Sequence, residues 1–399
     1  MDVSSCNQHS HETVPAVTGE LGFSMPSEVE PGVDERGLQR ATTRPLDYDF
    51  ERQFERRACQ VRDWSAPAAP PLDLLQMGFE SLDLSTDARL QALLATLRTA
   101  GEIDDAQARE VRRRLTGQVF RLSSGKCLKL LHVAAEGLIM RKGGPNGLKP
   151  DPEAQMDGMN DHDVAMAVHG DQDVFGTPLK QIMRGFAPRL FRHQSPDSSN
   201  RYSPLVLVNL WVPLQQVTRP LALMDRRTLD APRQQLRYAL PTETFLDRRD
   251  DMRFNDVWAF LHDQKQQWYY RADMGHEQAY VFDTLGEPHG SFMVPGEAVA
   301  EQYFKLLRTQ LAQLQSGSDP ERAPDAVPAL PADTPAPLRV AIGTMAAVAG
   351  QAADARQAGD TRWAEAARRA MDSVVRKSLE MRVVALLLPD LWPFNRQPR

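Results

Sequence analysis

Residues 205–214, with the sequence LVLVNLWVPL, are the most strand-like stretch of the chain. They are rich in β-branched and aromatic residues, which suit the pleated surface of a β-sheet. Three later segments have the same character: residues 268–271 (WYYR), 278–283 (QAYVFD) and 291–294 (SFMV). Because short segments of this kind alternate with turn sequences such as GEPHG at 286–290, the pattern predicts a β-sandwich or β-barrel rather than a parallel α/β sheet.

Further elements lie on both sides of this central region. Residues 57–64 alternate like a short strand, and the segments 118–122, 127–132 and 136–141 predict strands joined by glycine-containing turns. Apolar residues recur at helical spacing over 87–99 and 105–115, and Asp87 and either Asp104 or Asp105 can cap these two helices.

The two ends of the chain differ in composition from the centre. Residues 1–45 are polar and without periodicity, which predicts a disordered tail. Residues 297–315 have helical periodicity, residues 316–338 have the Pro/Ala-rich composition of a flexible linker, and an Ala-rich helical stretch covers about 340–375.

Composition excludes several classes of protein. The 399 residues carry a formal charge of −6, which argues against a general nucleic-acid binder held by phosphate contacts. The N-terminus resembles no secretion signal, and no run of 18 apolar residues predicts a membrane span. Three widely spaced cysteines form no disulfide framework and indicate a reducing compartment, so we expect a cytoplasmic protein.

A candidate metal site begins with His169 and Asp171. Residues two apart in a strand point to the same face, so an imidazole and a carboxylate converge here. They supply two of the three ligands of the 2-His-1-carboxylate triad, which holds Fe(II) and leaves coordination positions of the metal open. His289, at a turn before a predicted strand, is the candidate for the third. The alternatives are a surface pair for the first two residues and a solvent-exposed turn histidine for the third.

The segment 376–383 (RKSLEMRV) offers a candidate anion site. Read as a strand, it places Arg376, Ser378, Glu380 and Arg382 on one face. A guanidinium beside a hydroxyl is suited to a carboxylate, because arginine donates two parallel hydrogen bonds and stays charged when desolvated. An Arg-x-Ser pair would suit the distal carboxylate of 2-oxoglutarate. In that arrangement we expect Arg382 to pair with Glu380 or another local acid. The same residues also fit an amphipathic helix end.

Several of these segments together resemble a known family, the hydroxylase/desaturase family of Fe(II)/2-oxoglutarate-type oxygenases, which includes a fungal gibberellin desaturase and a cephamycin methoxylation component. The resemblance covers about residues 60–390 with the order of the motifs preserved. It is carried by VHGD at 168–171, NLWVPL at 209–214, RPLALMD at 219–225, WYY at 268–270, FDT at 282–284, PHGSF at 288–292 and RKSLEMR at 376–382.

The resemblance implies a mainly β fold with helices, in which a double-stranded β-helix (jelly roll) core carries an N-terminal cap. It implies that His169, Asp171 and His289 bind Fe(II). It also implies that Arg376 and Ser378 hold 2-oxoglutarate as cosubstrate, with Arg382 as the alternative anchor. The expected reaction is hydroxylation or desaturation of a small organic substrate with O₂, in secondary metabolism.

The chain departs from the family pattern at three places. Val212 stands where the family has an arginine, and Thr284 replaces a serine. The interval of 87 positions from His289 to Arg376 exceeds the usual one, so residues 297–372 are expected to be a helical insertion within an oxygenase domain spanning 46–399. Insertions between strands cost little free energy. Two other functions fit the same fold: an iron oxidase that needs no 2-oxoglutarate, and a metal-free scaffold that binds a partner.

Overall fold

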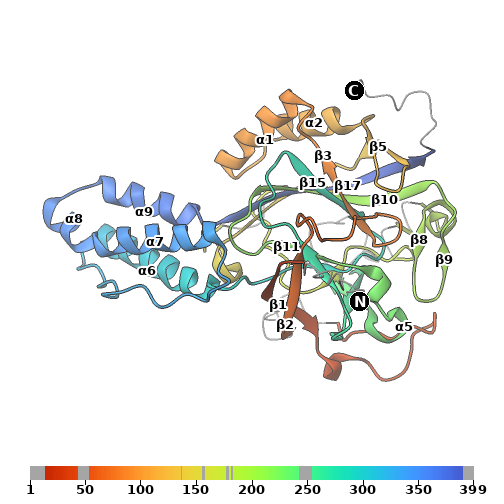
Figure 1. Cartoon of the computed structure of the whole chain (residues 1–399), viewed down its shortest axis with the longest axis horizontal. Coiled ribbons are helices and arrows are strands. Elements are labelled where there is room, and N and C mark those ends of the chain that lie inside the picture. The colour runs from red at the N-terminus through yellow and green to blue at the C-terminus, as the bar shows by residue number, and fades with distance from the viewer. Residues whose placement is uncertain are drawn as a thin grey trace, which may run out of the picture.

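A computed structural model describes residues 14–43, 54–135, 137–154, 158–176, 179–180, 183–241 and 254–389 (Figure 1). In these residues the structure consists of two large β-sheets with helices packed against them, so the prediction of a mainly β protein with helices is confirmed. Among the described residues, no helix has both the length and the apolar character that crossing a membrane requires.

The first sheet has eight strands and contains both candidate histidines. Its pairs are antiparallel except for β14 with β2. In spatial order the strands are β1 (Ala16–Ser24), β2 (Phe54–Asp63), β14 (Trp268–Tyr270), β11 (Leu221–Met224), β16 (His289–Ser291), β7 (His169–Gly170), β13 (Phe254–Phe260) and β12 (Gln235–Pro241).

The second sheet is built around the stretch LVLVNLWVPL and the C-terminal strand. Its spatial order is β3 (Phe79–Asp83), β15 (Gln278–Asp283), β10 (Leu205–Gln215), β17 (Arg376–Leu388), β5 (Cys127–Val133) and β4 (Val119–Arg121), and β6 (Ile139–Gly143) also pairs with β17. A separate hairpin joins β8 (His193–Gln194) to β9 (Ser199–Asn200). The segment 376–382 is therefore a strand, and the helical alternative is wrong.

Helices α1 (Ala88–Ala100) and α2 (Asp105–Leu115) pack on the outer face of the second sheet (Figure 1). Asp87 caps α1 by accepting hydrogen bonds from the backbone N–H groups of Arg89 and Leu90. Asp104 and Gln107 form a capping box at the start of α2. Both predicted caps are thus confirmed. The short helices are η1 (Pro26–Glu28), η3 (Pro145–Gly147), α4 (Ala187–Leu190), η4 (Arg226–Thr228) and α5 (Ala231–Gln234).

Four helices cover residues 297–372 and project to one side of the sheets, at the left of Figure 1. They are α6 (Glu297–Gln315), α7 (Ala336–Gly350), α8 (Ala352–Ala358) and α9 (Arg362–Asp372). The expected long stretch over 340–375 is therefore three helices. Their buried side chains join one hydrophobic cluster with Phe23 of the first sheet and with Phe292, which directly follows β16. The helices consequently share a core with the sheet.

Alternation along β10 shows which side of the second sheet faces the first. Val208, Leu210 and Val212 belong to the cluster under α1 and α2. Trp211 points the other way, into a cluster that includes Leu221 and Leu223 of the first sheet. The buried polar residue Asn209 shares the face of Trp211. The inner faces of both sheets therefore enclose a space in which polar side chains can meet.

The expectation of a disordered tail over residues 1–45 is wrong for the part that the structure describes. Residues 16–24 form β1, which pairs with β2 along its whole length. Leu21 and Phe23 of this strand are fully buried. Residues 14–43 therefore belong to the folded core, while residues 1–13, 44 and 45 lie outside the described part of the chain.

Candidate metal centre

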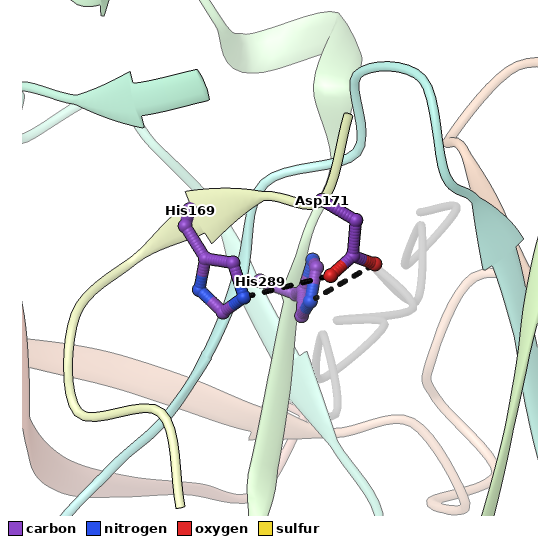
Figure 2. Close-up of side chains that lie close together, drawn as sticks. All are labelled: His169, Asp171 and His289. Carbon is purple, nitrogen blue, oxygen red and sulfur yellow. Dashed lines mark ion pairs between the residues drawn. The ribbon is translucent and has the colours of Figure 1, made fainter. Parts of the chain in front are cut away.

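Two histidines and an aspartate converge in the space between the sheets. His169 lies on β7, Asp171 directly follows that strand, and His289 begins the neighbouring strand β16 opposite His169. Asp171 Oδ1 is 3.7 Å from His169 Nε2, and Asp171 Oδ2 is 3.7 Å from His289 Nε2 (Figure 2). The three ligand atoms lie within 4.8 Å of one another, which is close enough for one metal ion.

Hydrogen bonds orient both imidazoles toward this common point. His169 Nδ1 lies 2.9 Å from the carbonyl oxygen of Ala167, and His289 Nδ1 lies 2.9 Å from that of Glu287. A carbonyl oxygen can only accept, so each Nδ1 carries the proton and each Nε2 keeps a free lone pair. Bonds of this kind fix the tautomer and ring orientation of metal-binding histidines.

The electrostatics of the group also suit a cation. Burial lowers the pKa of His169 to about 4, and the nearby His289 adds to the shift, so His169 is neutral near pH 7. Burial raises the pKa of Asp171, but the neighbouring His289 and Arg382 outweigh it and the net shift is downward. A neutral imidazole and an ionised carboxylate are the states in which these side chains bind metals.

Asn209 is a further residue of the site, not singled out from sequence as part of it. Its Nδ2 donates a 2.7 Å hydrogen bond to Asp171 Oδ2, and both side chains are buried. The bond occupies a lone pair of one carboxylate oxygen and restrains the rotation of the carboxylate. A signal was present in the sequence, because Asn209 is the one strongly polar residue in LVLVNLWVPL.

Replacing Asn209 with alanine is expected to weaken divalent-metal binding by about 10- to 100-fold, the usual cost of losing a partner that orients a ligand. Titration with Co²⁺, followed by visible absorption, measures the affinity. Asn200→Ala is the matched control, because the Asn200 amide donates to the carbonyl oxygens of Pro188 and Arg189 in the β8–β9 region. Equal Co²⁺ affinities of Asn209→Ala and the wild type would show that the hydrogen bond does not orient Asp171.

A small pocket adjoins the two histidines, and Arg376 lines the same pocket. The Arg376 side chain is 2% exposed and its guanidinium carbon lies 5.2 Å from the centre of the Trp211 ring. Its Nη1 donates to the carbonyl oxygen of Arg219 at 3.1 Å, and its Nη2 donates to Ser378 Oγ at 3.3 Å. Burial lowers the pKa of Arg376 to about 9 while Glu380 opposes the shift, so the side chain remains a cation near neutral pH.

The other two charged residues on this face of β17, Glu380 and Arg382, each lie near a different partner. Glu380 lines the pocket and pairs with Arg141 of β6, whose Nε lies 2.8 Å from Glu380 Oε2. Glu380 Oε1 is 3.9 Å from Arg376 Nη2. Of the two partners expected for Arg382, Glu380 or another local acid, Glu380 pairs instead with Arg141 and Arg376. Arg382 lies opposite Asn209 in the β10–β17 register, and its charge acts on Asp171.

The structure places five of the six predicted site residues in the triad or at the pocket beside it, and it places the sixth, Arg382, near enough to Asp171 for its charge to lower the pKa of that carboxyl. His169, Asp171 and His289 form the cluster, and Arg376 with its neighbour Ser378 lies at the adjoining pocket. Arg382 is not among the residues that line this pocket. Because strand residues advance by about 3.3 Å each, the backbones of Arg376 and Arg382 are about 20 Å apart along β17.

Comparison with known proteins gives a family model that matches part of the chain and solved structures that are similar at low sequence identity. Residues 149–302 match a family model described as "Oxidoreductase/YMDC permease-like domain", which covers less than half of the chain. No curated protein matches. Among solved structures, the "iron and alpha-ketoglutarate-dependent endoperoxidase NvfI" is similar with a TM-score of 0.45 at 14% identity, over 93% of this chain and 98% of that chain. A variant of that enzyme gives a TM-score of 0.47 at 14% identity, over 94% and 98%.

Proposed function

We propose that the protein is a mononuclear non-haem iron oxygenase that uses 2-oxoglutarate and O₂ to oxidise a small organic substrate. The observation that carries the proposal is that His169, His289, Arg376 and Glu380 line one and the same pocket. A metal-binding triad beside a buried guanidinium is the arrangement that a metal-chelating dicarboxylate requires. The matched family model, whose description includes an oxidoreductase, spans all three residues of the triad.

The donor set fits Fe(II). Two imidazole nitrogens and one carboxylate form the facial triad of non-haem iron oxygenases, which leaves the opposite positions open. Both Nε2 atoms are prepared as donors by the Nδ1 hydrogen bonds, and Asp171 supplies the anionic ligand. The same set also suits Zn²⁺. The adjoining arginine pocket favours the iron–cosubstrate assignment over a simple zinc site.

The pocket fits the far carboxylate of 2-oxoglutarate. Arg141 and Arg376 both face the pocket and share one carboxylate, Glu380. The Arg376 Nε has no hydrogen-bond acceptor among the described residues. A buried guanidinium without full compensation is costly, so an incoming carboxylate supplies the charge and acceptors that the fold omits.

Each residue then has a defined task. Iron with 2-oxoglutarate supplies the activation of O₂ that removes hydrogen from the substrate. His169, Asp171 and His289 hold the ion, Asn209 restrains Asp171, and Arg376 with Ser378 orients the cosubstrate. The walls of the two sheets exclude water from the reacting atoms. The outcome is a hydroxylated or desaturated small molecule, for which we propose a role in secondary metabolism.

Two structural assignments belong to the same proposal. The two facing sheets are assigned as the halves of a double-stranded β-helix, with α1 and α2 as part of its cap. Residues 297–372 are assigned as a helical insertion. The convergence of the three ligand side chains disfavours a metal-free scaffold. The buried Arg376 in the same pocket disfavours an iron oxidase that works without 2-oxoglutarate.

The test is an anaerobic titration of the purified protein with Fe(II) and 2-oxoglutarate. We expect a weak visible charge-transfer band that saturates at one equivalent of each, because the keto acid chelates the bound ion. Succinate, which has both carboxylates but no keto group, is the control and is expected to give no band. Iron binding without any band on adding 2-oxoglutarate would favour the cosubstrate-independent oxidase. Failure to bind iron would contradict the proposal.

A further inference from the structure

Arg219 connects the proposed cosubstrate anchor to the strand that carries His289. Its carbonyl oxygen accepts the 3.1 Å hydrogen bond from Arg376 Nη1. Its own Nη2 donates at 2.9 Å to both the carbonyl oxygen and the Oγ of Ser291, two residues after His289 on β16. Arg219 is 3% exposed. One buried residue therefore contacts both the anchor on β17 and the strand of the triad.

The backbone of Arg219 adopts an unfavourable conformation. Its φ is +49°, in the left-handed region that residues other than glycine seldom enter. Such a conformation is costly for a residue with a side chain and persists only where the surroundings hold it in place. The position of the Arg219 carbonyl oxygen, which accepts the hydrogen bond from Arg376, therefore depends on the contacts that restrain Arg219.

Glu297, the first residue of α6, supplies this restraint. Its side chain is fully buried, and its Oε2 accepts hydrogen bonds from the backbone N–H groups of Arg219 at 3.3 Å and Val294 at 3.0 Å. Its Oε1 accepts from the N–H of Asn146 at 2.7 Å. Burial raises the pKa of Glu297, while the adjacent Arg219 opposes the shift. The carboxylate therefore ties α6 directly to the strained residue.

The other end of the helical segment holds the same loop. Thr218 Oγ1 donates at 2.6 Å to the carbonyl oxygen of Val374, between α9 and β17. Gln215 Nε2 donates at 2.8 Å to the carbonyl oxygen of Val375, directly before Arg376. The loop from β10 to β11 is therefore bound by the start of α6 and by the junction after α9.

We propose that the helices α6–α9 position the cosubstrate anchor, with Glu297 and Arg219 as positioning residues that set the guanidinium of Arg376 for a dicarboxylate. The inference rests on the proposed use of 2-oxoglutarate. It assigns a function to residues 297–372 beyond that of an inserted segment. The physical reason is that a free arginine side chain samples many rotamers, so a fixed acceptor prepares it for the ligand.

The test compares Glu297→Gln with Glu301→Gln, its matched control one turn later on α6. Glu301 accepts hydrogen bonds from the side chains of Asn146 and Lys305. We expect Glu297→Gln to weaken 2-oxoglutarate binding about tenfold, the value of one hydrogen bond to a charged group. Fe(II) affinity is expected to stay within about twofold of the wild type, because the ligands of the triad are untouched. Calorimetry with 2-oxoglutarate and with Fe(II) separately measures both.

A double-mutant cycle shows whether the effect passes through Arg376. Adding Glu297→Gln to Arg376→Lys is expected to cost much less than it costs in the wild type, since coupled residues are not additive. Thr218→Val, which removes the bond to Val374 without changing shape, gives the same comparison should Glu297→Gln not fold. Full additivity, wild-type 2-oxoglutarate affinity in these variants, or equal losses of iron and cosubstrate affinity would overturn the inference. A wild-type protein that binds no 2-oxoglutarate would refute the proposed function itself.

Discussion

Replacement of Asp171 with alanine is expected to abolish iron-dependent turnover. Asp171 is the only carboxylate in the candidate triad, and both of its oxygens face an imidazole Nε2 at 3.7 Å. Without it, two imidazoles remain, and the ion loses its one anionic protein ligand. Fe(II) affinity should fall further than it does when only an orienting residue is removed, which costs about 10- to 100-fold. Equilibrium dialysis with Fe(II) under anaerobic conditions measures it.

The control for this variant is Asp163→Ala. Asp163 precedes the triad in the same region, but its side chain is 57% exposed and its carboxylate lies 3.5 Å from Lys149 Nζ. It is expected to bind iron like the wild type. Asp171→Ala also leaves the buried Asn209 amide without its acceptor, which costs about 1–3 kcal/mol of folding free energy. Thermal melts of the metal-free proteins separate that loss from the loss of the ion. Normal iron binding and turnover by Asp171→Ala would disprove the triad.

The proximity of His169 and Asp171 was predictable because it depends on a local rule, whereas His289 reaches them through the long-range pairing of β16 with β7. A two-residue period places His169 and Asp171 together, and the β16 strand begins at the turn that contains His289. The role of Asn209 depends on the register between β10 and the loop after β7, which sequence periodicity does not define. The Arg141–Glu380 ion pair was likewise not predictable from sequence periodicity, because it follows from the pairing of β6 with β17.

The strand β1 could not be recognised from its sequence for a physical reason. Two glycines interrupt it, and glycine normally weakens a strand. In the structure a side chain at Gly19 would collide with the ring of Phe292, and one at Gly22 would lie 2.9 Å from the carbonyl oxygen of Met166. These glycines allow close packing on β16 and the segment before β7. A pattern typical of a loop thus belongs to a closely packed strand.

The secondary structure of the segment 376–382 could not be decided from its sequence alone. Its alternating charges suit a strand face and also a helix surface. Pairing with β10 on one side and with β5 and β6 on the other decides the matter, and these partners lie far away in the sequence. Leu379 and Met381 then enter the cluster under α1 and α2, while Arg376, Ser378 and Glu380 face inward. Long-range pairing, rather than local propensity, therefore forms the proposed anchor.

Arg376→Leu is expected to weaken 2-oxoglutarate binding by at least about thirtyfold, since removing one partner of a buried charged contact costs about 2–5 kcal/mol. Fe(II) affinity without cosubstrate should change little, because Arg376 is not one of the three ligands. Arg376→Lys should restore only part of the binding, because an ammonium cannot donate two parallel hydrogen bonds. The charge-transfer band, titrated with 2-oxoglutarate at saturating Fe(II), reports the affinity of each variant.

Arg382→Leu is the comparison that locates the anchor. It removes a guanidinium from the same strand face, about 20 Å along the backbone from Arg376. Arg382 acts on Asp171 rather than lining the pocket, so its loss should alter iron affinity more than 2-oxoglutarate affinity. The metal-free Arg376→Leu protein should be no less stable than the wild type, because a buried cation is replaced by an apolar side chain. Should Arg382→Leu carry the whole defect in 2-oxoglutarate binding, the anchor moves to Arg382. If neither variant changes that binding, the pocket beside the triad does not receive the cosubstrate.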